Sequence, residues 1–354
     1  MCKEKEKTFM TKGFYGGKFL PFHRGHLHCI LEASSRVDEL HVILFHSGKE
    51  EREALEQGTK FGNQYLTPKI REMVIRKELR SFEHIKVHSI DCSRIPTDLY
   101  LTSWEKEALE VEKVIGTFDY IFSSEPTYEP IFSKLYPHAK HLLIDVDRTL
   151  VPISGTTLRE VSPMKAYEFL PRAYQEFVNR SVLIVGTESC GKTTLVQKLA
   201  KHFNTSYTLE FARDFCIEYG IGDPDISLYP LFLYGQKMAE FEASRTANKV
   251  YFCDTEAIVT NYYSMLYENT DLEIARAVAA TQKYDLVIYL KPSNRWVDDG
   301  YRMHSQEEVR QENDRKLLAL FEEHGVELNI LEGTYEENYT NSIKLVRKMM
   351  AQND

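Results

Sequence analysis

Short apolar runs alternate with longer amphipathic stretches along the whole chain. Helical periodicity marks stretches such as Lys69–Arg80 and Trp104–Ile115, whereas the apolar runs are short enough to be buried strands. Strand and helix patterns in alternation are typical of parallel α/β folds, so we expect two consecutive α/β series, each with a mainly parallel sheet. The expected strands are Glu39–Phe45, Ile85–Ile90, Tyr120–Phe122, His141–Val146, Ser181–Val185, Ser206–Leu209, Val250–Cys253 and Leu286–Leu290.

The segment Val161–Asn179, which contains Pro163 and Pro171, separates the two series. We place the boundary near Arg172–Arg180, which gives one domain over residues 1–175 and another over 176–354. A chain of 354 residues is long enough for two domains that each bury a core. Hydrophobic residues at 43% and charged residues at 27% are typical of globular proteins.

Charge and composition narrow the function. A formal net charge of -9 opposes a protein that binds mainly to nucleic-acid phosphates. No apolar run approaches the roughly 20 residues that cross a bilayer, and the charged start Met1–Lys12 does not resemble a signal peptide. The six cysteines form no C-x-x-C pair, which indicates reduced thiols. We therefore expect a cytoplasmic protein without a membrane or DNA partner.

The second series opens with a phosphate-binding motif. The residues Gly186–Thr193 read G-x-x-x-x-G-K-T, after a strand and before the helical stretch Thr194–Phe203. Glycines allow the backbone N–H groups to face phosphate oxygens, and the helix start adds a positive dipole. The alternative is a glycine-rich turn with no ligand. The residues expected to bind ATP here are Gly186, Ser189, Gly191, Lys192, Thr193 and Thr194.

Two carboxylates follow strands of this second series. Glu210 lies where an open α/β sheet binds ligands, so it is a candidate to accept the proton of a substrate hydroxyl or to bind a sugar. An ion pair with Arg213 is the alternative. Asp254 ends a buried strand, as the acid that orients Mg²⁺ beside Thr193 does in P-loop enzymes. A helix N-cap is the alternative for Asp254, and the choice of general base between the two acids stays open.

The segment Pro292–Arg302 combines arginine, aspartate, glycine and tryptophan after the last of these strands. This mixture suits a lid over phosphates, in which Arg302 or Arg295 neutralises charge and Trp296 stacks on a planar base. A solvated loop is the alternative reading.

The first series carries two candidate anion sites. His23 and His26, three residues apart just before the expected helical stretch Leu27–Ser35, can both donate to one phosphate, and Gly25 leaves room for a nucleotide. Zinc binding by H-x-x-H is the competing interpretation. The second site is Ile153–Arg159, where hydroxyls, N–H groups and the Arg159 guanidinium gather. A capping box formed by Thr157 and Glu160 is its alternative.

Together, G-x-F-x-P-x-H-x-G-H at Gly17–His26 and I-S-x-T-x-x-R at Ile153–Arg159 resemble the signature motifs of nicotinamide-nucleotide adenylyltransferases. The P-loop, Tyr207–Arg213 and the R-W-V-D-D-G-Y-R segment resemble the ribosylnicotinamide kinase half of bifunctional NadR-type proteins. The resemblance covers nearly the whole chain. It implies a Rossmann-like nucleotidyltransferase domain, followed by a P-loop kinase domain with a lid.

The resemblance also implies the chemistry. The first domain would join nicotinamide mononucleotide to the adenylyl group of ATP, giving NAD and pyrophosphate, and the second would phosphorylate ribosylnicotinamide with ATP and Mg²⁺. No side chain would act as nucleophile. By motif, the ATP contacts of the first domain are Gly17, Phe19, His23, Gly25, His26, Ser154, Thr156 and Arg159. Substrate contacts are expected at Trp104, Ser124, Glu125, Tyr128, Arg213, Trp296 and Asp299.

Longer relatives carry an N-terminal helix-turn-helix domain, whereas only about a dozen residues precede the glycine-containing segment Gly13–Gly17 at the start of the first series, so we expect no DNA reading. A homo-oligomer is one option that the sequence leaves open. Two other functions also remain: a different nucleotidyltransferase fused to another nucleoside kinase, and a nucleotide-sensing regulatory protein.

Overall fold

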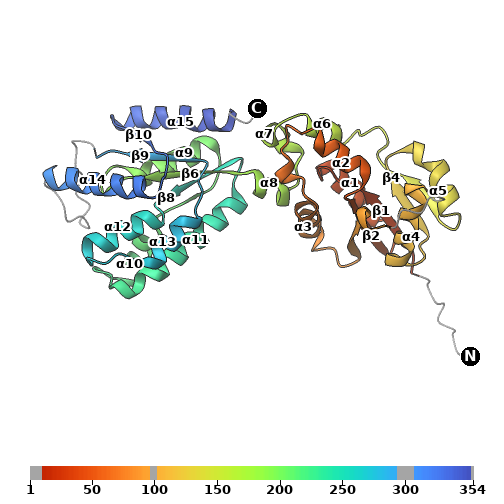
Figure 1. Cartoon of the computed structure of the whole chain (residues 1–354), viewed down its shortest axis with the longest axis horizontal. Helices are drawn as coiled ribbons and strands as arrows, with labels where there is room; N and C mark the ends of the chain where they lie inside the picture. The colour runs from red at the N-terminus through yellow and green to blue at the C-terminus, as the bar shows by residue number, and fades with distance from the viewer. Residues whose placement is uncertain (1–9, 96–101, 293–306, 352–354) are drawn as a thin grey trace, which may run out of the picture. The chain divides into compact units, whose positions relative to one another are not determined.

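The computed structural model describes residues 10–95, 102–292 and 307–351 (Figure 1). The chain divides after Val178 into two compact units, which we call the first and second domains. The expected boundary at residue 175 lies inside helix α8 (Arg172–Val178), and the whole helix belongs to the first domain. This follows from packing, because Ala173, Tyr174 and Val178 are buried in the first domain's core.

The first domain is built on a five-stranded sheet in the order β3-β2-β1-β4-β5, with every neighbouring pair parallel. The strand order reverses between β1 and β4, and open α/β sheets bind ligands beyond the carboxyl ends at such a point. The strands are β1 (Lys12–Gly17), β2 (Glu39–His46), β3 (Ile85–Asp91), β4 (Tyr120–Ser123) and β5 (Lys140–Leu143).

Strand β5 is shorter than the expected His141–Val146. It ends at Leu143 because the chain turns at Asp145, whose φ is 48°, and at Arg148, whose φ is 49°. The Asp145 carboxylate closes this turn by accepting from the Thr149 N–H at 2.9 Å. The residues expected to extend the strand thus form a loop at the ligand-binding edge of the sheet.

Helices cover both faces of this sheet (Figure 1). One apolar core lies against α1, α3 and α8, and another lies against α4 and α5. The helices are α1 (Arg24–Ser34), α2 (Lys49–Glu56), α3 (Pro68–Leu79), α4 (Ser103–Ile115), α5 (Glu129–Leu135), α6 (Gly155–Arg159), α7 (Pro163–Ala166) and α8.

The second domain also has a five-stranded parallel sheet, in the order β10-β9-β6-β8-β7. Edge strand β7 is limited to Tyr207–Thr208 rather than Ser206–Leu209, because only these two residues pair with β8. The other edge strand, β10 (Asn329–Leu331), was not predicted: it is short, and Ile330 at its centre is 48% exposed. The remaining strands are β6 (Arg180–Val185), β8 (Val250–Asp254) and β9 (Leu286–Leu290).

Helices again pack on both faces (Figure 1): α9 and α15 contribute to one core, α12 and α14 to the other. The helices are α9 (Lys192–Phe203), α10 (Phe211–Tyr219), α11 (Tyr229–Thr246), α12 (Ala257–Tyr267), α13 (Glu273–Thr281), α14 (Glu307–Glu323) and α15 (Tyr335–Ala351). Across the described ranges, no helix combines the length and apolar character that a membrane crossing needs.

Candidate active sites

A cavity of about 1000 Å³ opens at the carboxyl ends of β1 and β4 in the first domain. Every residue that the sequence assigned to a site in this domain lines it. The structure thus brings together segments that are more than a hundred residues apart. These lining residues are Gly17, Phe19, His23, Gly25, His26, Trp104, Ser124, Glu125, Tyr128, Ser154, Thr156 and Arg159.

His23 and His26 form a reciprocal cap at the start of α1. The Nδ1 of His23 accepts from the His26 N–H, and the Nδ1 of His26 accepts from the His23 N–H, both at 3.4 Å. The two rings stack with centroids 3.7 Å apart. This cap starts the helix at Arg24, earlier than the expected Leu27. Since each Nδ1 accepts a hydrogen bond, the neutral ring carries its proton on Nε2.

Burial keeps both imidazoles neutral. Desolvation, assisted by the nearby positive charge of Arg148, lowers the pKa of His23 to about 4. Burial likewise lowers the pKa of His26 well below its usual range. The pair therefore offers two neutral N–H donors at neutral pH, which suits a phosphate ligand.

Gly25 has a role that the sequence did not reveal. A Cβ at this position would lie 3.0 Å from both Cε1 and Nδ1 of His23, so glycine makes room for the histidine ring as well as lining the cavity. The zinc interpretation finds no further ligand, because the described residues contain no group of three or more His, Cys, Asp and Glu placed to hold a metal.

The second anion segment starts helix α6. Ser154 caps this helix by accepting from the Thr157 N–H at 3.1 Å, so the alternative interpretation, a capping box of Thr157 and Glu160, is wrong. The Arg159 guanidinium donates to the Leu20 carbonyl at 2.7 Å and to the Thr156 hydroxyl at 3.2 Å. These bonds join the two motifs at one wall of the cavity.

Another part of the cavity lining combines aromatic and acidic side chains. Trp104 packs edge-on against Tyr128, with ring centroids 5.2 Å apart. Glu125 accepts from Arg148 at 2.7 Å, and the Ser124 hydroxyl lies 3.3 Å from the thiol of Cys29. Sequence reasoning missed Arg148, which lines the cavity from the turn after β5 and lies in neither motif.

In the second domain, the P-loop joins β6 to α9. Gly186 has a φ of 146°, and a Cβ there would lie 2.4 Å from the Leu290 carbonyl oxygen. Gly191 adopts a left-handed conformation directly before α9. Lys192 is 6% exposed, and its ammonium donates to the Thr187 carbonyl at 2.9 Å. Among the described residues, the buried hydroxyl oxygens of Thr187 and Ser189 have no hydrogen-bond partner.

Two carboxylates lie at the same sheet edge. Asp254 is fully buried and accepts from the Thr193 hydroxyl at 2.5 Å. The N-cap interpretation of Asp254 is wrong, because Glu256 caps α12. Burial raises the pKa of Asp254 and of Glu210, although nearby cations oppose both shifts. Glu210 also forms the ion pair with Arg213, at 3.6 Å, that was the alternative to its functional interpretation.

Sequence reasoning missed Gln236, which connects these elements. This buried amide accepts from the Phe211 N–H at 2.9 Å and donates to the Asp254 carbonyl at 3.1 Å. It lies in the middle of the long helix α11 and belongs to no recognised motif, so the sequence alone does not identify it. The lid assignments at Arg295, Trp296, Asp299 and Arg302 lie outside the described residues.

Fold and sites define a two-domain nucleotide-binding protein, with a nucleotidyltransferase-like domain followed by a P-loop domain. Over 351 residues the chain is 30% identical to the trifunctional NAD biosynthesis/regulator protein NadR of Escherichia coli (strain K12), covering 97% of this chain and 84% of that protein. The chain belongs to the NadR family.

Further comparisons agree with this assignment. The NadR protein of Salmonella typhimurium (strain LT2) is 29% identical over 349 residues, covering 96% of this chain and 83% of that protein. Two NadR structures, one in complex with NR and one with NAD and AMP-PNP, share the fold with a TM-score of 0.72 at 24% identity. They cover 97% of this chain, and the chain covers 97% and 96% of theirs. A cytidylyltransferase-like family model matches residues 14–161, and an AAA domain model matches residues 181–338.

Proposed function

We propose that this chain makes NAD from ribosylnicotinamide in two ATP-dependent steps, one in each domain. The second domain, which begins at Asn179, phosphorylates ribosylnicotinamide to nicotinamide mononucleotide. The first domain then transfers the adenylyl group of ATP to that mononucleotide. The observation that carries this proposal is the presence of two separate phosphate-binding loops, each at the carboxyl edge of its own parallel sheet.

In the first domain, a phosphate oxygen of the mononucleotide attacks the α-phosphorus of ATP. The bond from that phosphorus to the bridging oxygen of pyrophosphate breaks, and pyrophosphate leaves. His23, His26 and Arg159 donate hydrogen bonds to the phosphates, and the hydroxyls of Ser154 and Thr156 lie beside them in the cavity wall. Catalysis consists of positioning and charge stabilisation. Trp104 and Tyr128 present aromatic surface to the acceptor nucleotide.

In the second domain, a hydroxyl of ribosylnicotinamide attacks the γ-phosphorus, and ADP leaves. Lys192 exchanges its bond to the Thr187 carbonyl for phosphate oxygens, and the unpartnered hydroxyls of Thr187 and Ser189 face the same loop. Glu210 accepts the proton of the attacking hydroxyl, since the Asp254 carboxylate already accepts from Thr193. Burial, which raises the pKa of Glu210, makes it a stronger base than an exposed glutamate.

The oxygen donors of Thr193 and Asp254 suit Mg²⁺, which prefers one or two protein oxygens together with substrate phosphates and water. When bound, this ion would neutralise charge on the phosphates.

The test uses the whole chain with ribosylnicotinamide, ATP and Mg²⁺, with both products followed by chromatography. His26→Ala should abolish NAD formation but leave mononucleotide formation intact. Lys192→Ala should abolish phosphorylation but still allow NAD formation when mononucleotide is supplied. Absence of both products from the wild-type chain would reject the proposal, and loss of both activities from either variant would reject independent sites.

A further inference from the structure

A chain of hydrogen bonds lies next to the cavity-lining loop Ser124–Tyr128, which is expected to contact the acceptor mononucleotide. The Glu129 carboxylate lies 2.5 Å from Nδ1 of His141, and Nε2 of His141 lies 2.8 Å from the Ser123 hydroxyl. The three residues come from α5, β5 and the last position of β4. The His141 side chain is 2% exposed, and its ring packs edge-on against Phe132 with centroids 5.0 Å apart. The His141 ring is therefore inside the domain, whereas the Glu129 side chain is 56% exposed and reaches it from the surface.

The chemistry of each group indicates which atom donates and which accepts in these hydrogen bonds. The carboxylate can only accept, so Nδ1 of His141 carries the proton that faces it. When the ring is neutral, Nε2 accepts from the Ser123 hydroxyl at 2.8 Å, and the same hydroxyl also lies 3.4 Å from the Glu125 carbonyl as a second, longer hydrogen bond. This leaves the lone pairs of the Ser123 oxygen pointing away from the imidazole.

The Ser123 oxygen also accepts a hydrogen bond from the loop that follows β4. The Ser123 oxygen accepts from the Glu125 N–H at 3.2 Å, within a tight turn that follows β4. The residues carried by this turn, Ser124, Glu125 and Tyr128, line the cavity, and the Glu125 side chain is paired with Arg148. Arg148 also lowers the pKa of both cavity histidines. The turn thus connects the hydrogen bonds of His141 to the residues of this loop that line the cavity.

We propose that Glu129, His141 and Ser123 form a positioning relay that sets the conformation of the Ser124–Tyr128 loop for the acceptor mononucleotide. None of the three is a catalytic residue, because Ser123 acts through the Glu125 backbone and the other two act through Ser123. The proposal rests on the proposed adenylyl transfer. It adds residues outside both sequence motifs that position the loop expected to bind the acceptor.

Steady-state kinetics of NAD formation test the relay. Ser123→Ala removes the hydroxyl that holds the loop, so the KM for the mononucleotide should rise about threefold to tenfold, as expected for one hydrogen bond. The KM for ATP and the kinase activity of the same chain should stay unchanged. Ser123→Thr keeps the hydroxyl and should restore the wild-type KM. Ser133→Ala is the matched control, since Ser133 bonds to Glu129 from the same helix without reaching the loop.

An unchanged mononucleotide KM in Ser123→Ala, or an equal rise in both KM values, would overturn the relay. If Ser123→Ala does not fold, Glu129→Gln supplies a second variant that keeps the side-chain volume and should raise the same KM by a smaller factor. An unchanged KM in that variant would equally count against the proposal.

Nitrogen-15 NMR of the His141 ring separates failure of the relay from failure of the proposed function. The wild-type protein should show a proton on Nδ1 and none on Nε2, and this can be measured without substrate. A neutral ring protonated on Nε2 would overturn the relay even in an active enzyme. The expected tautomer in a chain that makes no NAD would support the relay's geometry while rejecting adenylyl transfer.

Discussion

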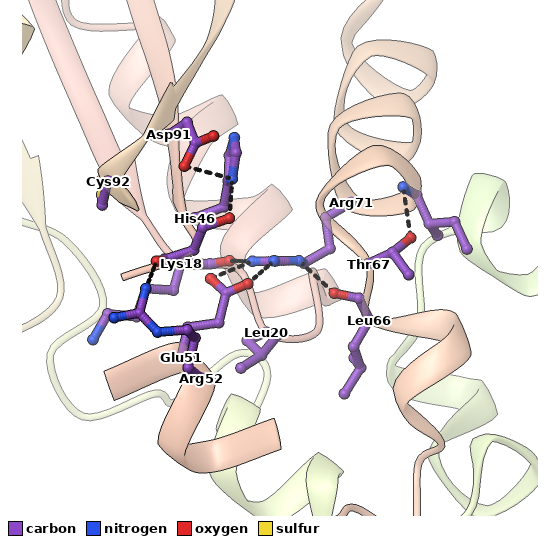
Figure 2. A network of polar contacts seen from close by, with 12 residues as sticks. Lys18, Leu20, His46, Glu51, Arg52, Leu66, Thr67, Arg71, Asp91 and Cys92 are labelled. Atoms are coloured by element: carbon purple, nitrogen blue, oxygen red, sulfur yellow. Dashed lines mark hydrogen bonds and ion pairs between the residues drawn. The ribbon is translucent and has the colours of Figure 1, made fainter. Parts of the chain in front are cut away.

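The buried ion pair between Glu51 and Arg71 should be essential for the stability of the first domain (Figure 2). Arg71 is fully buried and Glu51 is 3% exposed. The guanidinium contacts both carboxylate oxygens and also donates to two backbone carbonyls, those of Lys18 and Leu66. Lys18 lies within the Gly17–His26 motif, so the pair supports the loop that carries His23 and His26, which we propose bind phosphate.

Glu51→Gln keeps the shape of the side chain but removes the charge that compensates Arg71. Leaving one member of a buried ion pair without its partner typically costs about 3 to 5 kcal/mol. Since domains of this size are stable by only about 5 to 15 kcal/mol, the variant should lose a large part of its free energy of unfolding. At a urea dependence of about 2 kcal/mol per molar, the midpoint should fall by about 2 M.

Tryptophan fluorescence can follow this unfolding in one domain at a time. The chain has two tryptophans, so Trp296→Phe leaves Trp104 as a probe of the first domain. Glu50→Gln is the control: Glu50 is adjacent, its side chain is 75% exposed, and it pairs with Lys18 at the surface, where such pairs contribute about 0 to 1 kcal/mol. Equal urea midpoints for Glu50→Gln and Glu51→Gln would refute the reasoning.

Three further predictions follow from single groups. Gly186→Ala should eliminate kinase activity and leave adenylyl transfer intact in the product assay, because its Cβ would clash with the Leu290 carbonyl; normal phosphorylation would contradict this. The first domain should lose about 3 kcal/mol of stability as the pH falls from 6.5 to 4, seen by Trp104 fluorescence. The reason is that His23, with its pKa lowered to about 4, stays neutral when folded but becomes protonated when unfolded; a flat profile would argue against its burial. The second domain should instead lose stability as the pH rises from 4.5 to 7, because burial raises the pKa of Glu256 to about 7 and the folded state alone retains its proton. Glu256→Gln should reduce that slope in denaturation monitored by Trp296, and an unchanged slope would assign it to another group.

Local sequence was sufficient to predict the parts of each site that lie on one continuous segment. The P-loop and the two histidines are such segments, because a turn and the following helix start position all their groups. The buried pair of Glu51 and Arg71 was not predictable, since its partners are twenty residues apart and lie in no motif. The end of β5 was also missed, because Asp145 adopts a positive φ without being glycine.

Helix starts were predicted too late for a related reason. The sequence placed the starts of α1 and α9 at Leu27 and Thr194, whereas they begin at Arg24 and Lys192. His23 is not a usual capping residue, and its role depends on the reciprocal bond from His26. Gly191 precedes α9 in a left-handed conformation and makes no side-chain cap. In both cases the ligand-binding residues themselves start the helix, so a propensity scale cannot locate it.

Both proposed sites must stabilise the negative charge of phosphates, and they do so with different kinds of side chain. The first presents a polyphosphate with neutral imidazole N–H groups, whose low pKa keeps their protonation constant near neutral pH. The second uses the charged Lys192, which is buried beside Asp254 and held by the Thr187 carbonyl before any ligand arrives. A buried cation needs compensation, and Asp254 supplies negative charge nearby. Adenylyl transfer should therefore change little between pH 6 and 8, whereas the proposed phosphoryl transfer depends on carboxylates whose pKa values burial has raised.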